Sequence, residues 1–459
     1  MQRFVLYGWS RLIFWSLVVG IISCQSPEST EEPRKISIPL PETSQKISAK
    51  TEPKIPQNDF SSAYRLEDLL AYAYESNPGI LAARAKWESV LEKYPQVTTL
   101  PNPKLDYQYF YVPGAQRNMF VLSQMIPFPT KLYYDGEMVK EEVRIAHYEF
   151  EFKVKEVAVE IARTYYELCY LTQAIQLTQQ NQKLLEEFKK LSQEQYNLKK
   201  AILLDVLKGE QQVAQLSYDL ITLDEKKLSE EAKLNSLLNR DTQIQWGIPQ
   251  MLEPKETHFS LKELQSISMQ HEQELQRLDH QIKKSEYQVL RAKQNYFPDI
   301  ELQLQYETRG SRFDSPFENR PENGEDSGIG ISVELPIWVG KYKAEIREAQ
   351  KLLQQDQLLK QEKQQSLKEQ ITRRYYLYEN AIRLVKLYRN ILIPQAKQAM
   401  DIAENLYRDA KGEHTDYLET QLVWFNFNLA YQRSLTEQWI HLIEIENLIG
   451  IRLEVTHAK

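Results

Sequence analysis

The feature that most restricts the fold is a long stretch with almost no helix-breaking residues. Residues 130–248 contain no proline and only three glycines, Gly136, Gly209 and Gly247. If residues 132–197 form one helix, it is about 100 Å long at 1.5 Å per residue, whereas an average helix has about 11 residues. Ile161, Tyr165 and Leu168 repeat at helical spacing among Gln, Glu and Lys. This spacing is typical of coiled-coil packing, and a globular domain has no room for such a helix.

The chain also contains an internal repeat with a period of about 210 residues. Four pairs of segments match: Arg163–Tyr166 with Arg373–Tyr376, Tyr196 and Asp205 with Tyr407 and Asp416, Ile126–Lys131 with Leu335–Lys341, and Leu234–Leu238 with Ile445–Ile449. Because the matches keep the same order, we predict two equivalent halves, residues 61–250 and 251–459. Each half is expected to contain a helix, a strand pair and two very long helices.

The strand pairs are predicted from alternating apolar and polar residues. The alternating apolar positions are Ile300, Leu302, Leu304 and Tyr306, then Ile329, Ile331, Val333 and Leu335, and in the first copy Leu105, Tyr107, Tyr109 and Tyr111, with a return strand near Asn118–Ile126. This pattern is typical of a sheet with one wet and one apolar face, and the tyrosines suit a membrane interface. We predict single helices at Leu66–Lys93 and Leu261–Gln294. The second copy's long helix is expected at Tyr342–Tyr407, interrupted only by Pro394.

The N-terminus resembles a bacterial lipoprotein signal. Arg3 and Arg11 precede an apolar run that ends before Cys24, and the run is too short to span a bilayer as a helix. We therefore predict a signal peptide over residues 1–23, a palmitate-type lipid on Cys24 and, because Gln25 follows it, the outer membrane as destination. The alternative is an ordinary secretory signal with an incidental cysteine. Residues 24–60 are rich in proline and predict an extended tether.

Composition excludes several classes of function. The net charge of -7 and the pI near 5.7 exclude a basic nucleic-acid-binding stripe, and the mean hydropathy of -0.55 excludes a polytopic helical membrane protein. Cys169 is the only other cysteine, so no disulfide framework is expected, and a buried, inert thiol is the expected state of Cys169. His271 and Glu272 begin a zinc-protease pattern that lacks its second histidine. We expect no enzyme activity, catalytic residue, cofactor or bound metal.

Four strands per chain cannot close a barrel, and an open sheet edge in lipid would leave backbone groups unpaired. Several chains must therefore share one barrel. Three copies would supply twelve strands and twelve long helices. The predicted fold class is mainly α with a membrane β-barrel, in which helical hairpins form a periplasmic α-barrel below a shared trimeric sheet.

Several motifs, in their order along the chain, resemble the TolC family of outer-membrane efflux proteins from about Tyr64 to Ile451. They are Leu100–Pro103, Ser123–Pro127, Ile393–Ala396, and Tyr407 followed by Asp416–Gln421. The resemblance implies a lipid-anchored homotrimer that passes substrates from periplasm to exterior. It also implies a periplasmic adaptor and an inner-membrane transporter of the RND type. The lipid signal and Pro-Asn-Pro motif are similar to ducts of cobalt-zinc-cadmium and copper-silver pumps, so heavy-metal cations or drugs are the expected cargo.

The resemblance also assigns roles to the two helix-turn tips farthest from the strands. The predicted adaptor-docking residues are Lys199, Lys200, Ala201, Lys411, Gly412 and Glu413. Asp416 and Glu419 match acidic positions at the periplasmic entrance and lie three apart, on one helix face. Asp205 is the first copy's weaker candidate, because Lys208 replaces its second acid. The alternative is that these acids are exposed helix-end residues without a gating role.

A second hypothesis remains. A periplasmic coiled-coil scaffold lipoprotein would explain Cys24, the tether and the long helices without a pore. It does not explain four amphipathic strands placed symmetrically in two repeats.

Overall fold

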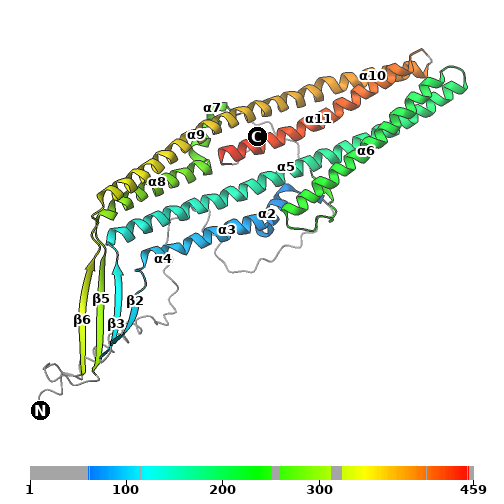
Figure 1. The fold of residues 1–459 in the computed structure, drawn as a ribbon. Coiled ribbons are helices and arrows are strands. Elements are labelled where there is room, and N and C mark those ends of the chain that lie inside the picture. The colour runs from blue at the N-terminus through cyan, green and yellow to red at the C-terminus, as the bar shows by residue number, and fades with distance from the viewer. Residues whose placement is uncertain are drawn as a thin grey trace. The chain divides into compact units, whose positions relative to one another are not determined.

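The computed structural model describes residues 60, 63–112, 115–250, 259–311, 323–409, 411–451 and 453. Cys24, the predicted signal peptide and all of the predicted tether except Phe60 lie outside the described residues. The described chain contains long helices that continue from one four-stranded sheet (Figure 1).

The two copies contain the same elements in the same order. The first copy comprises α2 (Leu66–Ser76), α3 (Pro78–Leu91), α4 (Lys93–Thr98), β2 (Lys104–Val112), β3 (Ala115–Ile126), α5 (Pro129–Asn197) and α6 (Leu203–Leu237). The second comprises α7 (Leu261–His271), α8 (Gln273–Lys293), the 3-10 turn η2 (Gln294–Tyr296), β5 (Ile300–Ser311), β6 (Asn323–Val333), α9 (Val339–Leu387), the π turn η3 (Tyr388–Leu392), α10 (Ile393–Arg408) and α11 (His414–Ile449). Two short strands, β1 (Ala63–Tyr64) and β4 (Ile248–Pro249), pair in parallel. With 69 residues, α5 confirms the predicted long helix.

The helix predicted at the start of each copy is broken in two, so the prediction of single helices is wrong. In the first copy the Asn77 side chain accepts a hydrogen bond from the Ile80 backbone N–H (3.1 Å), and Pro78 begins α3. In the second copy the Glu272 side chain accepts from the Leu275 N–H (2.8 Å) and begins α8. Both side chains satisfy backbone N–H groups that a helix start leaves unpaired. Pro78 was the signal in the sequence that the periodicity argument overlooked.

The long helix of the second copy continues through Pro394 by means of the π turn η3. Tyr376 and Tyr407 are separated by one residue more than their equivalents Tyr166 and Tyr196, and η3 lies between them. A π turn accommodates one extra residue in a helix, and Pro394, which lacks an N–H, follows at once. The expected interruption is therefore a local widening of the helix.

The sheet has the order β2-β3-β5-β6, with each neighbouring pair antiparallel. Its register aligns the predicted apolar positions: Leu304 lies opposite both Leu122 and Ile329, and Tyr107 lies opposite Phe120. Residues opposite each other share a face, so one face carries apolar residues from all four strands, with the polar Asn118 and Gln124 of β3 among them. We call it the apolar face; it contains Leu105, Tyr107, Tyr109, Phe120, Leu122, Ile300, Leu302, Leu304, Tyr306, Ile329, Ile331 and Val333. The predicted strands and their alternation are confirmed, except that Leu335 lies beyond the end of β6.

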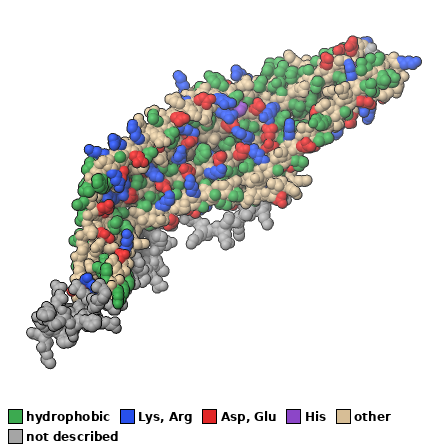
Figure 2. All heavy atoms as spheres, viewed as in Figure 1, with side chains coloured by type: hydrophobic (Ala, Val, Ile, Leu, Met, Phe, Trp, Pro, Cys, Tyr) green, Lys and Arg blue, Asp and Glu red, His purple; other side chains and the backbone are tan. Residues whose placement is uncertain are grey.

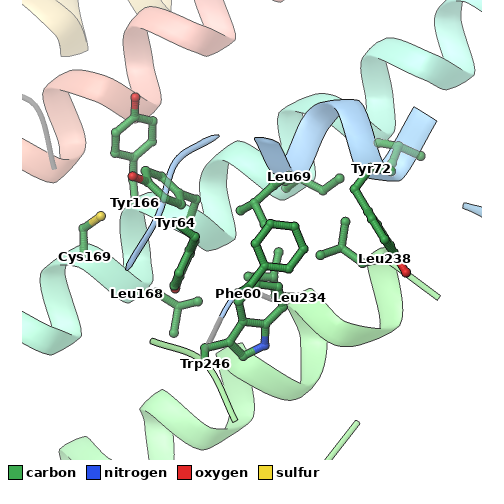
Figure 3. Packing of buried hydrophobic residues seen from close by; sticks show 14 of the residues in the cluster. Phe60, Tyr64, Leu69, Tyr72, Tyr166, Leu168, Cys169, Leu234, Leu238 and Trp246 are labelled. Atoms are coloured by element: carbon green, nitrogen blue, oxygen red, sulfur yellow. The ribbon is translucent and has the colours of Figure 1, made fainter. Parts of the chain in front are cut away.

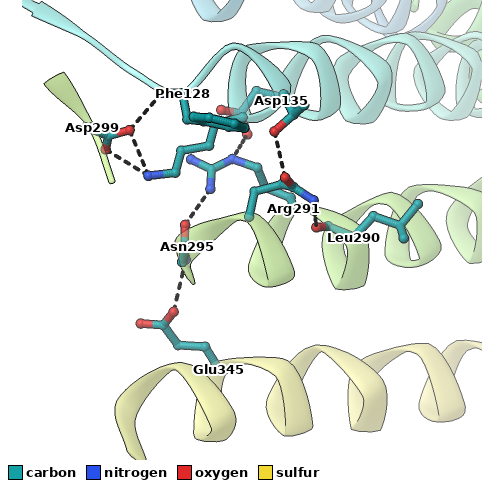
Figure 4. A network of polar contacts seen from close by, with 10 residues as sticks. Phe128, Asp135, Leu290, Arg291, Asn295, Asp299 and Glu345 are labelled. Carbon is teal, nitrogen blue, oxygen red and sulfur yellow. Dashed lines mark hydrogen bonds and ion pairs between the residues drawn. The ribbon is translucent and has the colours of Figure 1, made fainter. Parts of the chain in front are cut away.

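A buried ion pair joins the sheet to the helices (Figure 4). Lys131, the third residue of α5, donates to both carboxylate oxygens of Asp299 at 2.8 Å, just before β5. The backbone N–H of Phe128 also donates to Asp299 (2.8 Å). The Lys131 side chain is only 8% exposed. Nearby, Arg291 of α8 binds Asp135 of α5 (2.9 Å), so both contacts connect the first copy to the second.

The main hydrophobic core of the first copy lies where α2, α5 and α6 meet (Figure 3). Phe60 and Tyr64 pack on Trp246, with ring centroids 5.3 and 5.0 Å apart. Cys169 is buried among these residues, and this burial raises the pKa of its thiol to about 12. The thiol therefore remains protonated and unreactive near neutral pH.

The ends of α6 and α11 show the repeat at the level of single residues. Each helix ends beside the break that interrupts its copy's first helix. Asn77 donates from its side chain to the Leu237 carbonyl (2.7 Å), and a Cβ on Gly450 would lie 2.4 Å from the His271 carbonyl oxygen. Asn239 and Gly450 both have left-handed φ angles, 55° and 82°. Asn and Gly are the residues that adopt this conformation most readily.

Candidate entrance at the helix tips

Two helix-turn tips lie at the ends of the long helices remote from the sheet (Figure 1). The first joins α5 to α6, and the second joins α10 to α11. The predicted docking residues occupy these turns; Ala410, in the second turn, lies outside the described residues.

The first tip is held by backbone hydrogen bonds and one side-chain cap. The N–H groups of Lys200 and Ala201 both donate to the Gln195 carbonyl, at 2.8 and 3.3 Å. The Asp205 carboxylate accepts from the backbone N–H of Ile202 (3.3 Å), which fixes the start of α6. Lys199 adopts a left-handed φ of 59°. This is uncommon for a residue other than glycine, and it allows the chain to reverse within a few residues.

The second tip has the same hydrogen-bond pattern. The N–H groups of Lys411 and Gly412 both donate to the Leu406 carbonyl, at 2.9 and 3.0 Å. A Cβ on Gly412 would lie 2.9 Å from the Leu406 Cβ, so this turn is built around glycine. Ala201 occupies the equivalent place in the first tip, where the corresponding N–H to carbonyl distance is longer. The two turns therefore have one plan, with a slightly wider first turn.

An aromatic cluster supports the second tip. Phe188 of α5 packs on Tyr417 of α11, with ring centroids 3.9 Å apart. Phe188 also contacts the ring of His414 (4.9 Å), which lies three residues before Tyr417 on α11. His414 is 3% exposed and lies 5.5 Å from the Tyr407 ring. Neither of its ring nitrogens has a hydrogen-bond partner among the described residues. Burial lowers the pKa of His414, with Lys208 acting in the same direction and Asp205 against it.

The predicted acidic residues are exposed to different degrees. Asp416 and Glu419 are both exposed on the first turns of α11, and neither has an ion-pair partner within the described ranges. Asp205 is half-buried and caps α6. Lys208 donates to the hydroxyl of Thr415 (3.1 Å), and Thr415 is the residue immediately before Asp416. The structure thus brings the start of α6 and the start of α11 together.

Sequence reasoning missed an apolar surface on the first tip. The exposed apolar residues there are Leu198 (63%), Ile202 (60%), Leu203 (52%), Leu204 (52%) and Leu207 (51%). The consecutive apolar residues 202–204 beside a charged turn were the available signal. The two tips therefore differ in chemistry, because the second carries Asp409, Lys411 and Glu413 at its turn.

Two features are absent from the residues that the structure describes. No group of three or more His, Cys, Asp or Glu in these ranges is arranged to hold a metal ion. Among the described helices, none combines the length and apolar character needed to cross a bilayer.

The comparisons with known proteins agree with this architecture. Residues 264–450 match the family model of the outer membrane efflux proteins. This part of the chain is therefore similar to outer-membrane efflux proteins. The match covers α7 to α11 and both strands of the second copy, and the first copy repeats the same elements. The function of the chain is that of an outer-membrane efflux channel. Such channels are not enzymes.

Solved structures share the fold at low sequence identity. The outer membrane protein VceC of Vibrio cholerae is 15% identical, with a TM-score of 0.70 over 84% of this chain and 96% of VceC. CusC is 13% identical, with a TM-score of 0.73 over 87% of this chain and 96% of CusC. The CmeC outer membrane channel of Campylobacter jejuni is 15% identical, with a TM-score of 0.68 over 84% of this chain and 85% of CmeC. No curated protein sequence matches the chain.

Proposed function

We propose that three copies of this chain form the exit duct of a tripartite efflux pump. In this assembly the sheets close into one twelve-stranded barrel in the outer membrane, and the helices form a periplasmic tunnel. Two observations carry the proposal. The four-stranded sheet has a largely apolar face, and its outer strands, β2 and β6, each keep one edge without a partner strand among the described residues. Strands of 9 to 12 residues are long enough to cross a bilayer when tilted.

We further propose that Cys24 carries a lipid that anchors the duct, with residues 24–60 as tether. The charge pattern before Cys24 supports this assignment. The Cys24→Ala variant is expected to lose acyl labelling and to be soluble or mislocalised. Normal labelling of that variant would remove the lipoprotein assignment.

The tips are the proposed docking site for a periplasmic adaptor, which would connect the duct to an inner-membrane transporter of the RND type. The two chemically different tips support two distinct contacts. An apolar adaptor surface would suit the first tip, and a charged one would suit Lys411 and Glu413. Cysteine crosslinking should capture the adaptor at residues 198–205 and 409–416. Capture only near the strands would contradict this placement.

Asp416 and Glu419 are the proposed acidic ring of the entrance, because both are exposed and unpaired within the described ranges. Three subunits would bring several carboxylates together at one mouth, which favours cations. Heavy-metal cations or drugs are the proposed cargo. The resemblance to metal-pump ducts supports the former, although a duct need not bind its cargo.

A scaffold lipoprotein without a pore is the second hypothesis. It gives no role to a sheet with a largely apolar face. Migration of the purified protein on a gel separates the two: a duct gives a trimer that dissociates on heating in SDS, whereas a scaffold of this kind gives no heat-modifiable barrel.

A further inference from the structure

A buried histidine lies at the contact between the two tips. His414 is the first residue of α11, and its ring lies 4.9 Å from the Phe188 ring of α5 and 5.5 Å from the Tyr407 ring of α10. Only 3% of the residue is exposed. On the face of the molecule drawn in Figure 2, acidic and basic side chains reach the surface at the tips, whereas no histidine is visible there. The imidazole is therefore enclosed by aromatic rings.

The ring of His414 has polar atoms that this enclosure does not satisfy. Neither ring nitrogen has a hydrogen-bond partner in the described part of the chain. A neutral imidazole carries one N–H donor and one acceptor, so burial here leaves both unpaired. A phenylalanine ring would fill a similar space without unpaired polar atoms. The chain thus has a titratable ring at a position where packing alone requires only an aromatic one.

The rings around His414 connect three helices. Phe188 of α5, Tyr407 of α10 and Tyr417 of α11 belong to one buried cluster. The Tyr407 hydroxyl donates to the Ser192 hydroxyl of α5 (3.4 Å). Loss of the His414 ring from this cluster would remove a contact of α11 with both α5 and α10 at once.

We propose that His414 is a proton-binding switch that releases the second tip from α5 and α6. In its neutral form the ring packs between Phe188 and Tyr407 and holds the start of α11 in place. After proton uptake it is a buried cation without an acceptor, and it leaves the aromatic enclosure to reach water or a carboxylate. Because the start of α11 carries Asp416, its release changes the entrance. This last step rests on the proposed duct.

Charged groups on the facing helix determine how strongly the site resists a proton. Burial lowers the pKa of His414; of the two nearby charges on α6, Asp205 opposes this shift and Lys208 adds to it. Lys208 donates to the Thr415 hydroxyl at 3.1 Å, next to His414 in the chain. Glu413 gives α11 no side-chain cap, so His414 lies at an uncapped helix N-terminus. A helix N-terminus disfavours a cation, which adds to the effect of Lys208.

The other titratable groups near the ring respond to pH in a different range. The phenols of Tyr407 and Tyr417 stay neutral, because burial raises the pKa of each. Glu404 and Arg408 of α10 form an ion pair (2.7 Å). The remaining acids that face Tyr417 or flank His414 in the chain are Asp401, Glu187, Glu413 and Asp416. Carboxylates usually titrate near pH 4, so between roughly pH 5 and 7 His414 is the group of this set that changes charge.

Hydrogen–deuterium exchange at the first turn of α11 tests the switch in the intact protein without requiring a pore. Release that takes up one proton increases by up to about tenfold for each pH unit below about 6.5. After correction for the intrinsic effect of pH on exchange, protection of this turn should fall in that proportion in the native protein. It should fall much less in His414→Phe, which keeps an aromatic ring. Equal loss of protection in the two proteins would overturn the proposal.

Two substitutions on α6 distinguish a proton switch from packing, because they should act in opposite directions. Lys208→Gln removes the ammonium group, and its amide can still donate to Thr415, so less protection should be lost in acid than in the native protein. Asp205→Asn removes the opposing carboxylate, and its amide oxygen can still accept from Ile202, so more protection should be lost. Effects of the same sign, or no effect, would contradict the role of these charges.

Conductance in planar bilayers tests the consequence for the entrance. The ratio of single-pore conductance at roughly pH 5.5 to that at roughly pH 7.5, one unit on either side of the usual histidine pKa, should be higher for the native protein than for His414→Phe. Both proteins have the same carboxylates at the entrance, so the difference isolates His414. Equal ratios would overturn the proposed effect on the entrance. If the native protein forms no pore at either pH, the proposed duct fails, whereas the exchange experiment still decides the switch.

Discussion

The buried pair Lys131–Asp299 allows a quantitative test of what connects the sheet to the helices. In the Asp299→Ala variant, the Lys131 ammonium loses two hydrogen bonds of 2.8 Å and the Phe128 N–H loses its acceptor. Removing one partner of a buried pair costs about 3–5 kcal/mol. Because the Asp299 side chain is 23% exposed, we expect the lower end of this range, about 3 kcal/mol.

Hydrogen–deuterium exchange at the first turn of α5 measures this cost locally. Since each 1.4 kcal/mol corresponds to a factor of ten, exchange should accelerate about a hundredfold. Lys341→Ala is the matched control, because Lys341 is 65% exposed and lies 3.9 Å from Glu345. An exposed pair of this kind contributes about 0–1 kcal/mol, so exchange at the start of α9 should change little.

Two comparisons would refute the reasoning. If Asp299→Ala and Lys341→Ala accelerate exchange equally, burial does not control the strength of these pairs. The double variant Lys131→Met with Asp299→Ala should recover part of the lost protection, because no uncompensated charge remains buried. No recovery would mean that the loss comes from packing.

Three further predictions concern the tips. Acidification should loosen the second tip. The pKa of His414 in the folded chain lies below its usual 6.5, so the unfolded chain takes up a proton first as the pH falls. Stability is therefore retained above about pH 6.5 and is lost as the pH falls toward the folded pKa. His414→Phe should remove this dependence of exchange at the start of α11. Gly412→Ala should destabilise the second tip by about 1–3 kcal/mol through its clash with Leu406, visible as faster local exchange, whereas unchanged exchange would contradict the close packing. Trivalent cations added from the periplasmic side should block the native pore more strongly than the variant Asp416→Ala with Glu419→Ala, and equal block would rule out the acidic ring.

The sequence was sufficient for features that depend on periodicity. The alternation in Ile300–Tyr306 fixed both the strand and its apolar face, and the lack of proline predicted the long helix α5. These signals are local, because each residue reports its own side of a strand or helix. The repeat extended them to the first copy, where the pattern around Tyr107 is less regular.

Other features depend on contacts that no local pattern encodes. The break at Glu272 has no proline, and Gly450 at the end of α11 packs against the same backbone. The Lys131–Asp299 pair joins residues of different copies. At the entrance, the acidic positions could be named from the resemblance, but the contact of Lys208 with Thr415 required the structure.

Conductance across a planar bilayer tests the central claim most directly. Purified protein that migrates as a heat-dissociable trimer should form stable, ion-conducting pores when reconstituted from detergent. If the trimer and its variant Asp416→Ala with Glu419→Ala both give no conductance above that of a protein-free bilayer, the result would contradict the proposed duct.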